Sequence, residues 1–185
     1  MNTYVVLIRG INVGGINKVP MADLKQGLKD LGYIDVETYI NSGNVILMSV
    51  KSANEIRLEI ESQLPKWFKL DSKLIKVLVI SKTTLNDIVK SKPAGFGDEP
   101  TKYHSDVIFL MDIDIDQAFA IFDPRANVDY VWKGEGVVYS RRLSTERTRS
   151  RLNKIMISPL YKSMTIRNWN TTKKLFGMVN KKLDI

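Results

Sequence analysis

The chain has 185 residues, of which 44% are hydrophobic and 26% charged, and it carries a net charge of +8. This composition is typical of a globular protein of one domain or two small ones. The lack of cysteine excludes disulfides, thiolate nucleophiles and cysteine metal sites. With His104 as the single histidine, a histidine zinc site and a Ser/His/Asp triad are also disfavoured, so the sequence predicts no metal site.

The first apolar run of the chain stops at Arg9, and no later run approaches the roughly 18 residues that a membrane span needs. The first run is also too short for a signal peptide. We therefore expect a cytoplasmic protein with no membrane partner.

Residues 1–80 predict the element order βαββαβ. A β-branched strand, 4–8, leads into the loop 9–20, where three glycines and a proline prevent regular structure. A helix with apolar residues at helical spacing follows and stops at Gly32. The other expected elements are strands 36–40 and 45–48 around the turn 41–44, a helix that Ser52 and Glu55 cap and Pro65 interrupts, and strand 74–80. This order is that of a ferredoxin-like unit.

Residues 103–167 predict the same order a second time. The expected elements are strand 107–111, a helix around 118–122 that Asp114 or Asp116 caps, strands 128–133 and 137–142 around the turn 134–136, a helix that starts at Leu152 and ends at Pro159, and strand 164–167. A last helix runs from Trp169 to about Val179. The predicted fold class is therefore α+β, with duplicated ferredoxin-like βαββαβ units and an extra C-terminal helix.

These elements divide the chain into four segments. The sequence predicts a first ferredoxin-like subdomain at 1–80, a linker with a short helix at 81–102, a second ferredoxin-like subdomain at 103–167, and a C-terminal helix and tail at 168–185. The linker is marked by the Pro/Gly-rich stretch 93–97.

Positive charge is concentrated towards the C-terminus. Between Arg141 and Lys182 there are twelve Lys or Arg residues and a single acid, Glu146. This bias is typical of surfaces that attract phosphates or nucleic acid, but a solvated basic helix face has the same pattern. The sequence leaves both interpretations open.

Two strand-to-helix junctions could bind an anion. In the loop 9–20, backbone amides freed by glycine can point at a ligand beside Arg9 and Lys18, although a turn that needs glycines for its own geometry has the same pattern. At the second junction, Arg167 precedes a helix whose expected N-cap is Asn168, so two positive features converge there, and an anion or an internal carboxylate could neutralise them. The candidate anion-binding residues are Arg9, Asn12, Gly14, Gly15, Lys18, Arg167 and Asn168. We further expect Arg9 and Arg167 to share one pocket at the subdomain boundary.

Two other patterns favour structural roles. The run Asp112–Asp116 is similar to a calcium loop, but Gln117 replaces the glycine and Asp123 the bidentate glutamate that such a loop requires, so helix capping is the better interpretation. His104 stands alone at the start of a strand and is expected to be structural.

Three motifs together carry a family resemblance. They are Leu7–Gly15 with Val19–Met21, Thr38–Val45, and Thr165–Thr171. Over nearly the whole chain they resemble the bacterial "domain of unknown function" family numbered 1697. The resemblance implies a fold of two ferredoxin-like subdomains and brings no established activity. The positions that match the family's signature, to which the resemblance assigns no role, are Arg9, Asn12, Gly14, Gly15, Ser42, Gly43, Asn44, Arg167, Asn168 and Trp169.

Three functional hypotheses follow from these patterns. The first is a non-enzymatic or regulatory binder of a phosphate-bearing ligand, a nucleotide or nucleic acid. The second is a small enzyme with its site between the subdomains, where Arg9 or Arg167 stabilises developing negative charge. The third is a protein-interaction scaffold without a pocket. The sequence leaves the catalytic residues, the cofactor and the oligomeric state unassigned.

Overall fold

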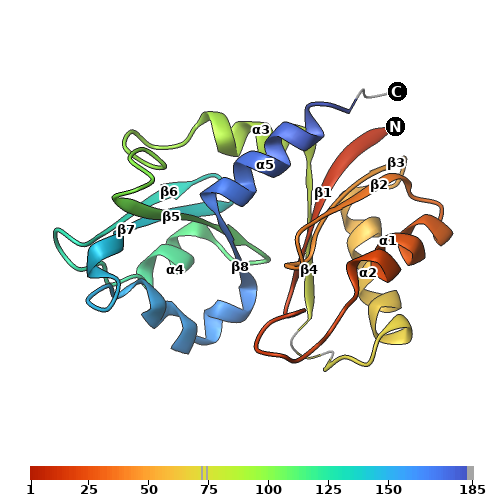
Figure 1. The fold of residues 1–185 in the computed structure, drawn as a ribbon, viewed down its shortest axis with the longest axis horizontal. Coiled ribbons are helices and arrows are strands. Elements are labelled where there is room, and N and C mark those ends of the chain that lie inside the picture. The colour runs from red at the N-terminus through yellow and green to blue at the C-terminus, as the bar shows by residue number, and fades with distance from the viewer. Residues whose placement is uncertain (72, 74, 183–185) are drawn as a thin grey trace. The chain divides into compact units, whose positions relative to one another are not determined.

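The computed structural model describes residues 1–71, 73 and 75–182 of the chain. Two four-stranded antiparallel sheets, each with helices, form the framework (Figure 1). The chain divides into two compact units: unit 1 comprises Met1–Asn86 and the segment from Leu175 onward, and unit 2 comprises Asp87–Lys174. The four-segment division predicted from the sequence stays a proposal beside this one.

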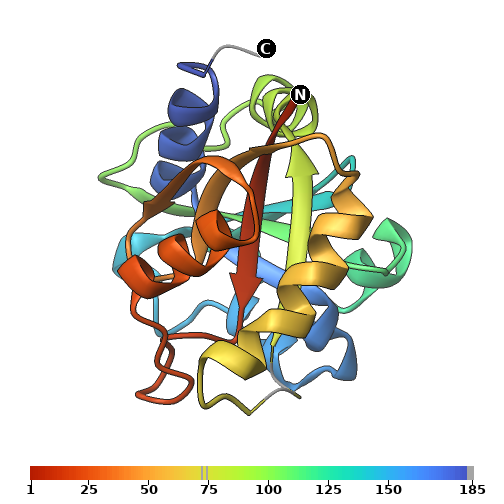
Figure 2. The ribbon, with the colours of Figure 1, turned by 90° about the vertical axis from the view of Figure 1, so that its right-hand side faces the viewer.

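Unit 1 has the ferredoxin-like order that the sequence predicts. Its elements are β1 (Asn2–Arg9), α1 (Met21–Asp30), β2 (Ile34–Tyr39), β3 (Asn44–Ser49), α2 (Ala53–Trp67) and β4 (Lys76–Ser81). The strands lie in the order β2-β3-β1-β4, and every neighbouring pair is antiparallel. Figure 2 shows α1 and α2 on the same face of this sheet.

The core of unit 1 follows from the apolar stripes of its two helices. Leu24 and Leu28 of α1 and Ile56 and Ile60 of α2 are fully buried in one cluster with alternate residues of β1 such as Val6. The helical spacing of these residues in the sequence therefore predicts both the helices and the faces that they bury.

The ends of α2 show one prediction confirmed and one corrected. Ser52 accepts a hydrogen bond from the Glu55 amide while the Glu55 side chain accepts one from the Ser52 amide, which is the predicted capping box. Pro65 does not interrupt the helix, contrary to the prediction. It lies in the last turn, where its missing N–H removes a single hydrogen bond and the helix ends at Trp67 in any case.

Unit 2 repeats the strand order of unit 1. Its elements are β5 (Tyr103–Leu110), α4 (Ile115–Ala120), β6 (Asp129–Gly134), β7 (Val137–Leu143), the 3₁₀ helices η2 (Ser144–Glu146), η3 (Leu152–Ile157) and η4 (Pro159–Ser163), and β8 (Met164–Asn168). The order β6-β7-β5-β8 corresponds strand for strand to that of unit 1. Two helices, α3 (Lys82–Lys90) and α5 (Trp169–Val179), contain residues of both units.

One predicted helix of unit 2 is replaced by 3₁₀ helices. The sequence predicts a helix from Leu152 to Pro159 with Met156 on its apolar face, whereas η3 and η4 occupy this region and Met156 is exposed. The buried pair Leu152 and Ile155 is spaced by three residues, which places both side chains on one line in a 3₁₀ helix. Pro159 has no N–H to donate, so η3 cannot continue through it, and η4 begins there.

A shared hydrogen bond supports the duplication. In unit 1 the Ile8 amide donates to Gly43 O at 2.8 Å, and in unit 2 the Leu110 amide donates to Gly136 O at 3.0 Å. Both glycines lie in hairpin turns and have positive φ, 73° and 67°. The hairpin turns therefore occupy equivalent places in two βαββαβ units, as predicted.

The C-terminal segment is tied to the first sheet within unit 1. Lys182 Nζ donates to Asp35 and, at 2.6 Å, to Glu37 of β2, and Lys82 Nζ donates to Lys182 O at 3.0 Å. Burial lowers the pKa of Lys182, but its hydrogen bonds to the two carboxylates outweigh burial, so the pKa lies above its ordinary value. Within the described ranges, no helix is long and apolar enough to cross a membrane.

Candidate functional site

The glycine loop of unit 1, residues 9–20, contains a tight turn. Val13 and Ile16 form an isolated β-bridge, and Gly14 and Gly15 between them have φ values of 60° and 79°. Both values lie in the left-handed region that glycine adopts without steric cost. The glycines therefore serve the geometry of the turn, which is one of the two interpretations that the sequence left open, and both are exposed.

Two asparagines fix the loop in place. Asn12 Nδ2 donates to Val19 O at 2.9 Å and to Asn41 O at 2.8 Å, and Asn12 Oδ1 accepts from the Val19 amide at 2.8 Å. The buried Asn17 donates to Gly10 O at 2.9 Å. Because backbone groups occupy its amide, Asn12 positions the loop against the β2–β3 hairpin.

An open hollow of about 400 Å³ lies beside this loop. The residues that line it are Asn12, Gly15, Lys18, Val19, Pro20 and Asn41. Lys18 is exposed, and its ammonium makes no ion pair with any described residue. Pro20 precedes α1 and provides no side-chain cap for its first amides. Three of the predicted anion-binding residues, Asn12, Gly15 and Lys18, thus line a hollow that reaches the residue before α1.

At the second predicted junction, Arg167 is buried. It is 7% exposed, and its Nη1 donates to Thr165 Oγ1 at 2.8 Å and to Ile166 O at 2.9 Å. Burial lowers the pKa of this guanidinium to about 10, so it remains charged at neutral pH. Asn168 Oδ1 accepts from the Asn170 amide at 2.8 Å and caps α5, as predicted.

The predicted site residues therefore fall into two groups. Arg9, Asn12, Gly14, Gly15 and Lys18 belong to unit 1, and Arg167 and Asn168 belong to unit 2. The expected shared pocket of Arg9 and Arg167 stays a prediction.

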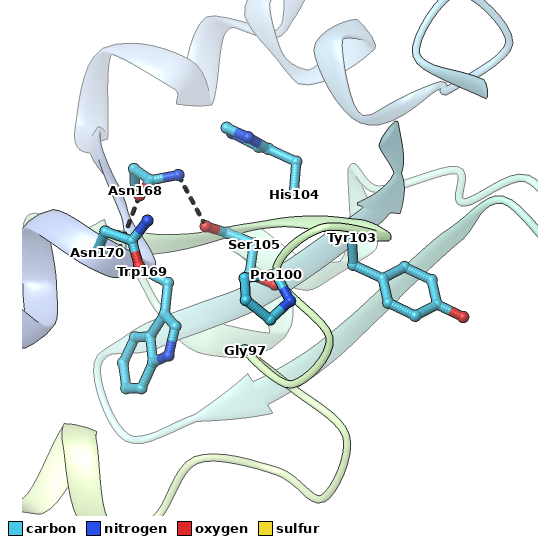
Figure 3. A pocket seen from close by; sticks show the side chains of 8 residues that line it. All are labelled: Gly97, Pro100, Tyr103, His104, Ser105, Asn168, Trp169 and Asn170. Carbon is cyan, nitrogen blue, oxygen red and sulfur yellow. Dashed lines mark hydrogen bonds between the residues drawn. The ribbon is translucent and has the colours of Figure 1, made fainter. Parts of the chain in front are cut away.

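A second cavity, of about 70 Å³, lies in unit 2 where β8 passes into α5 (Figure 3). The residues that line it are Gly97, Pro100, Tyr103, His104, Ser105, Asn168, Trp169 and Asn170. Trp169 is 6% exposed and packs edge-on against Phe96 with ring centroids 5.1 Å apart, so it lies in the core. His104 Nε2 lies 3.1 Å from Asp106 Oδ1.

The chain is similar to known proteins in sequence and in fold. The family described as "Protein of unknown function (DUF1697)" matches residues 1–139. The chain belongs to this family. Among solved structures it is similar to the conserved bacterial protein SP0830 from Streptococcus pneumoniae, with 26% identity and a TM-score of 0.82 over 96% of this chain and 98% of that one. No curated protein matches the chain.

Two residues that resemble the signature of the DUF1697 family have structural roles in this chain. A Cβ added to Gly43 would lie 2.6 Å from Ile8 O, so only glycine fits there without displacement. Asn44 is fully buried, and its Nδ2 donates to Tyr39 O at 3.1 Å. These contacts close the hairpin turn on β1.

The basic C-terminal region is partly neutralised within the fold of this DUF1697 member. Five of the twelve basic residues between Arg141 and Lys182 pair with carboxylates, namely Arg142, Arg149, Arg151, Lys154 and Lys182. The Arg141 guanidinium lies over the rings of Tyr103 and Tyr130, at 4.0 and 4.5 Å from their centroids. In the described part of this segment, the cations that are exposed and outside carboxylate pairs are Arg147, Lys162, Lys173, Lys174 and Lys181.

Sequence reasoning missed the cavity of unit 2. Gly97 has a φ of 75°, and a Cβ added there would overlap the Trp169 indole. The Pro/Gly-rich composition of 93–97 signals a loop, but it carries no information about a contact with a residue so distant in the sequence. Ser105 gives no signal at all, because a serine in a strand is ordinary. Among the described residues, no group of three or more His, Cys, Asp or Glu side chains could hold a metal ion.

Proposed function

We propose that the protein binds a phosphate-bearing small ligand in the hollow beside the glycine loop of unit 1. The observation that carries this proposal is the meeting of Lys18 with the uncapped start of α1 at the wall of that hollow. Helix N-terminal amides and a lysine ammonium are donors that proteins use for phosphate. A volume of about 400 Å³ is within the range of small-ligand sites.

The rigidity of the loop also supports the proposal. The hydrogen bonds of Asn12 and Asn17 hold the loop backbone in place before any ligand arrives, so little ordering entropy has to be lost on binding. Asp23 acts in the opposite direction, because its exposed carboxylate lies in the first turn of α1. We expect its charge to weaken an anion at this site.

The other sequence hypotheses receive less support. The residues that line the hollow include no carboxylate and no histidine, so the general acid or base that an enzyme would use is missing from this wall. A continuous basic track for nucleic acid is disfavoured by the carboxylate pairs of the C-terminal region. A small-ligand binder is therefore the function that the geometry favours.

The first test is a calorimetric titration of the full chain with inorganic phosphate and with adenosine monophosphate. Lys18→Ala should weaken binding about tenfold or more, which corresponds to the loss of one charge-assisted contact of about 1.5 kcal/mol or more. Lys29→Ala removes the same charge from the exposed last turn of α1 and is the matched control. Equal affinities for the two variants would reject the role of Lys18.

A second test uses the missing helix cap. Pro20→Asp places a capping carboxylate on the first amides of α1, which should stabilise the fold by about 0.5 to 2 kcal/mol and abolish phosphate binding. Pro20→Ala supplies no cap and should bind more tightly than Pro20→Asp. Asp23→Asn should raise the affinity. If Pro20→Asp binds phosphate as well as Pro20→Ala, the ligand does not use this helix end.

A further inference from the structure

The cavity of unit 2 forms where a strand edge loses its partner. β8 pairs with β5 only as far as Asn168 opposite Asp106, and the chain then turns into α5. β5 extends further, to Tyr103, without pairing to β8. The cavity of about 70 Å³ lies along this edge, between the start of β5, the start of α5 and the loop that contains Gly97 and Pro100 (Figure 3).

Ser105 lines this cavity with a hydroxyl group that makes no hydrogen bond within the described chain. The residue is 6% exposed, and its Oγ has no hydrogen-bond partner among the described residues. Buried polar groups in folded proteins are nearly always hydrogen-bonded, and an isolated hydroxyl destabilises the fold. Since Ser105 lines the cavity, a molecule inside it is the natural partner of this hydroxyl.

A second donor lies in the same wall. The indole N–H of Trp169 faces Gly97, which also lines the cavity, and no described residue accepts its hydrogen bond. Trp169 is the first residue of α5, so the positive end of the helix dipole adds to the same side.

The charges around the cavity favour a negatively charged group. None of the eight residues that line it is acidic. Asp106, which faces His104, also lies 3.7 Å from Arg142, so a cation balances its charge. The Arg141 guanidinium lies over Tyr103, a lining residue, and its buried Nε has no hydrogen-bond partner within the described chain. Hydrogen-bond donors and the start of α5 therefore line the space, and no acidic residue does.

The size of the cavity limits the ligand. One water position needs roughly 10 to 15 Å³ of such space, so the cavity has room for a group of a few non-hydrogen atoms and not for a nucleoside. We propose that this cavity binds a small oxyanion, a carboxylate or a phosphate group, with Ser105 Oγ and Trp169 Nε1 as hydrogen-bond donors. The site belongs to unit 2 and is separate from the hollow of unit 1.

The indole N–H signals of the full chain in nitrogen-15 NMR test this site directly. The chain has three tryptophans, and Trp169→Phe identifies the signal of Trp169. Titration with inorganic phosphate in one arm and with acetate in the other should move that signal in a saturable manner and leave the Trp67 signal unmoved. A shift in the phosphate arm alone assigns a phosphate group, and a shift in the acetate arm alone assigns a carboxylate. No shift in either arm overturns the proposal.

Two serine variants separate binding from packing. Ser105→Ala should weaken the effective anion about tenfold or more while the chain stays at least as stable, because the hydroxyl has no internal partner to lose. Ser140→Ala alters a buried serine on β7 outside the cavity lining and should leave the affinity unchanged. An unchanged affinity in Ser105→Ala, or its clear destabilisation, overturns the proposal. Lys18→Ala should keep the Trp169 shift, so failure at one site is distinguishable from failure at the other.

Discussion

At the scale of single residues, the two hairpin glycines show how one residue type meets different demands at equivalent positions. Gly43 and Gly136 both have positive φ and both accept a hydrogen bond from the first strand of their unit. A Cβ on Gly43 would lie 2.6 Å from Ile8 O, whereas a Cβ on Gly136 would meet nothing within 4 Å. Strain from φ is therefore common to both positions, and the steric overlap belongs to Gly43 alone.

This difference predicts unequal costs of substitution. Gly136→Ala should lower the free energy of unfolding by about 1 to 2 kcal/mol, the cost of placing a Cβ in the left-handed region. Gly43→Ala adds a collision with the backbone of β1 and should cost about 3 kcal/mol or more. Urea unfolding of the two variants measures both values. Equal losses would show that β1 can move away from the turn without cost.

The side-chain contacts of the candidate site residues depend on neighbours that the sequence does not reveal. Asn12 was singled out as an anion ligand, yet its side chain is occupied by Val19 and Asn41 backbone groups. The glycine pattern fits both a loop with free amides and a tight turn, because both need positive φ. Asn168, singled out by its place before a helix, has the structural role that the sequence predicts, that of N-cap.

At the scale of elements, the partly buried carboxylate of Glu59 connects α2 to the segments beside it. Lys51 Nζ donates to both carboxylate oxygens of Glu59, at 2.8 and 2.7 Å, and the Tyr33 hydroxyl donates to the same carboxylate. Burial raises the pKa of Glu59, but the hydrogen bonds from Lys51 and Tyr33 outweigh it, so the pKa lies below its ordinary value. Burial and the neighbouring carboxylate raise the pKa of Tyr33.

The lowered pKa of Glu59 predicts a stability that depends on pH. A carboxyl group of this kind stabilises the fold above its unfolded pKa of about 4.3, and the contribution is lost as the pH falls through the folded value. Glu59→Gln should therefore cost up to about 1 kcal/mol at neutral pH, and its difference from wild type should shrink below pH of about 4. Chemical unfolding across this range measures the difference. In a Lys51→Met background the effect of Glu59→Gln should be smaller, and an undiminished effect would contradict the role of the ion pair.

Elements were predictable where their signals are local. The capping residues Ser52 and Asp114 mark the starts of α2 and α4 because a cap depends on neighbours three residues away or fewer. The helix predicted from Leu152 to Pro159 is present as 3₁₀ helix instead of α-helix, because one apolar pair spaced by three residues fits both types alike. The unit 2 cavity depends on contacts between distant segments, and no local pattern reports those.

At the scale of the whole molecule, the two units show why the fold was predictable from a repeated order of elements. Each unit has the strand order of the other, although one helix of unit 1 corresponds to 3₁₀ helices in unit 2. The same strand order therefore forms with α-helix or 3₁₀ helix at this position, and in both units the hairpin turn bonds to the first strand. The distribution of charge along the chain also matters at this scale, because it determines how strongly the protein binds a polyanion such as nucleic acid.

The pairing of the basic C-terminal region predicts weak binding to nucleic acid. Five cations of this region, Arg147, Lys162, Lys173, Lys174 and Lys181, are exposed and outside carboxylate pairs in the described chain. Each phosphate that a protein neutralises on B-DNA changes the slope of log K against log salt by about −0.9, so we expect a slope no steeper than roughly −4.5 and no measurable binding at physiological salt. Fluorescence anisotropy with a labelled duplex, at several salt concentrations, measures this slope. Replacing Lys173 and Lys174 by Ala should flatten the slope by up to about 1.8, whereas a wild-type slope well beyond −4.5 would mean that phosphates displace the carboxylates from the paired cations and would restore the nucleic-acid hypothesis.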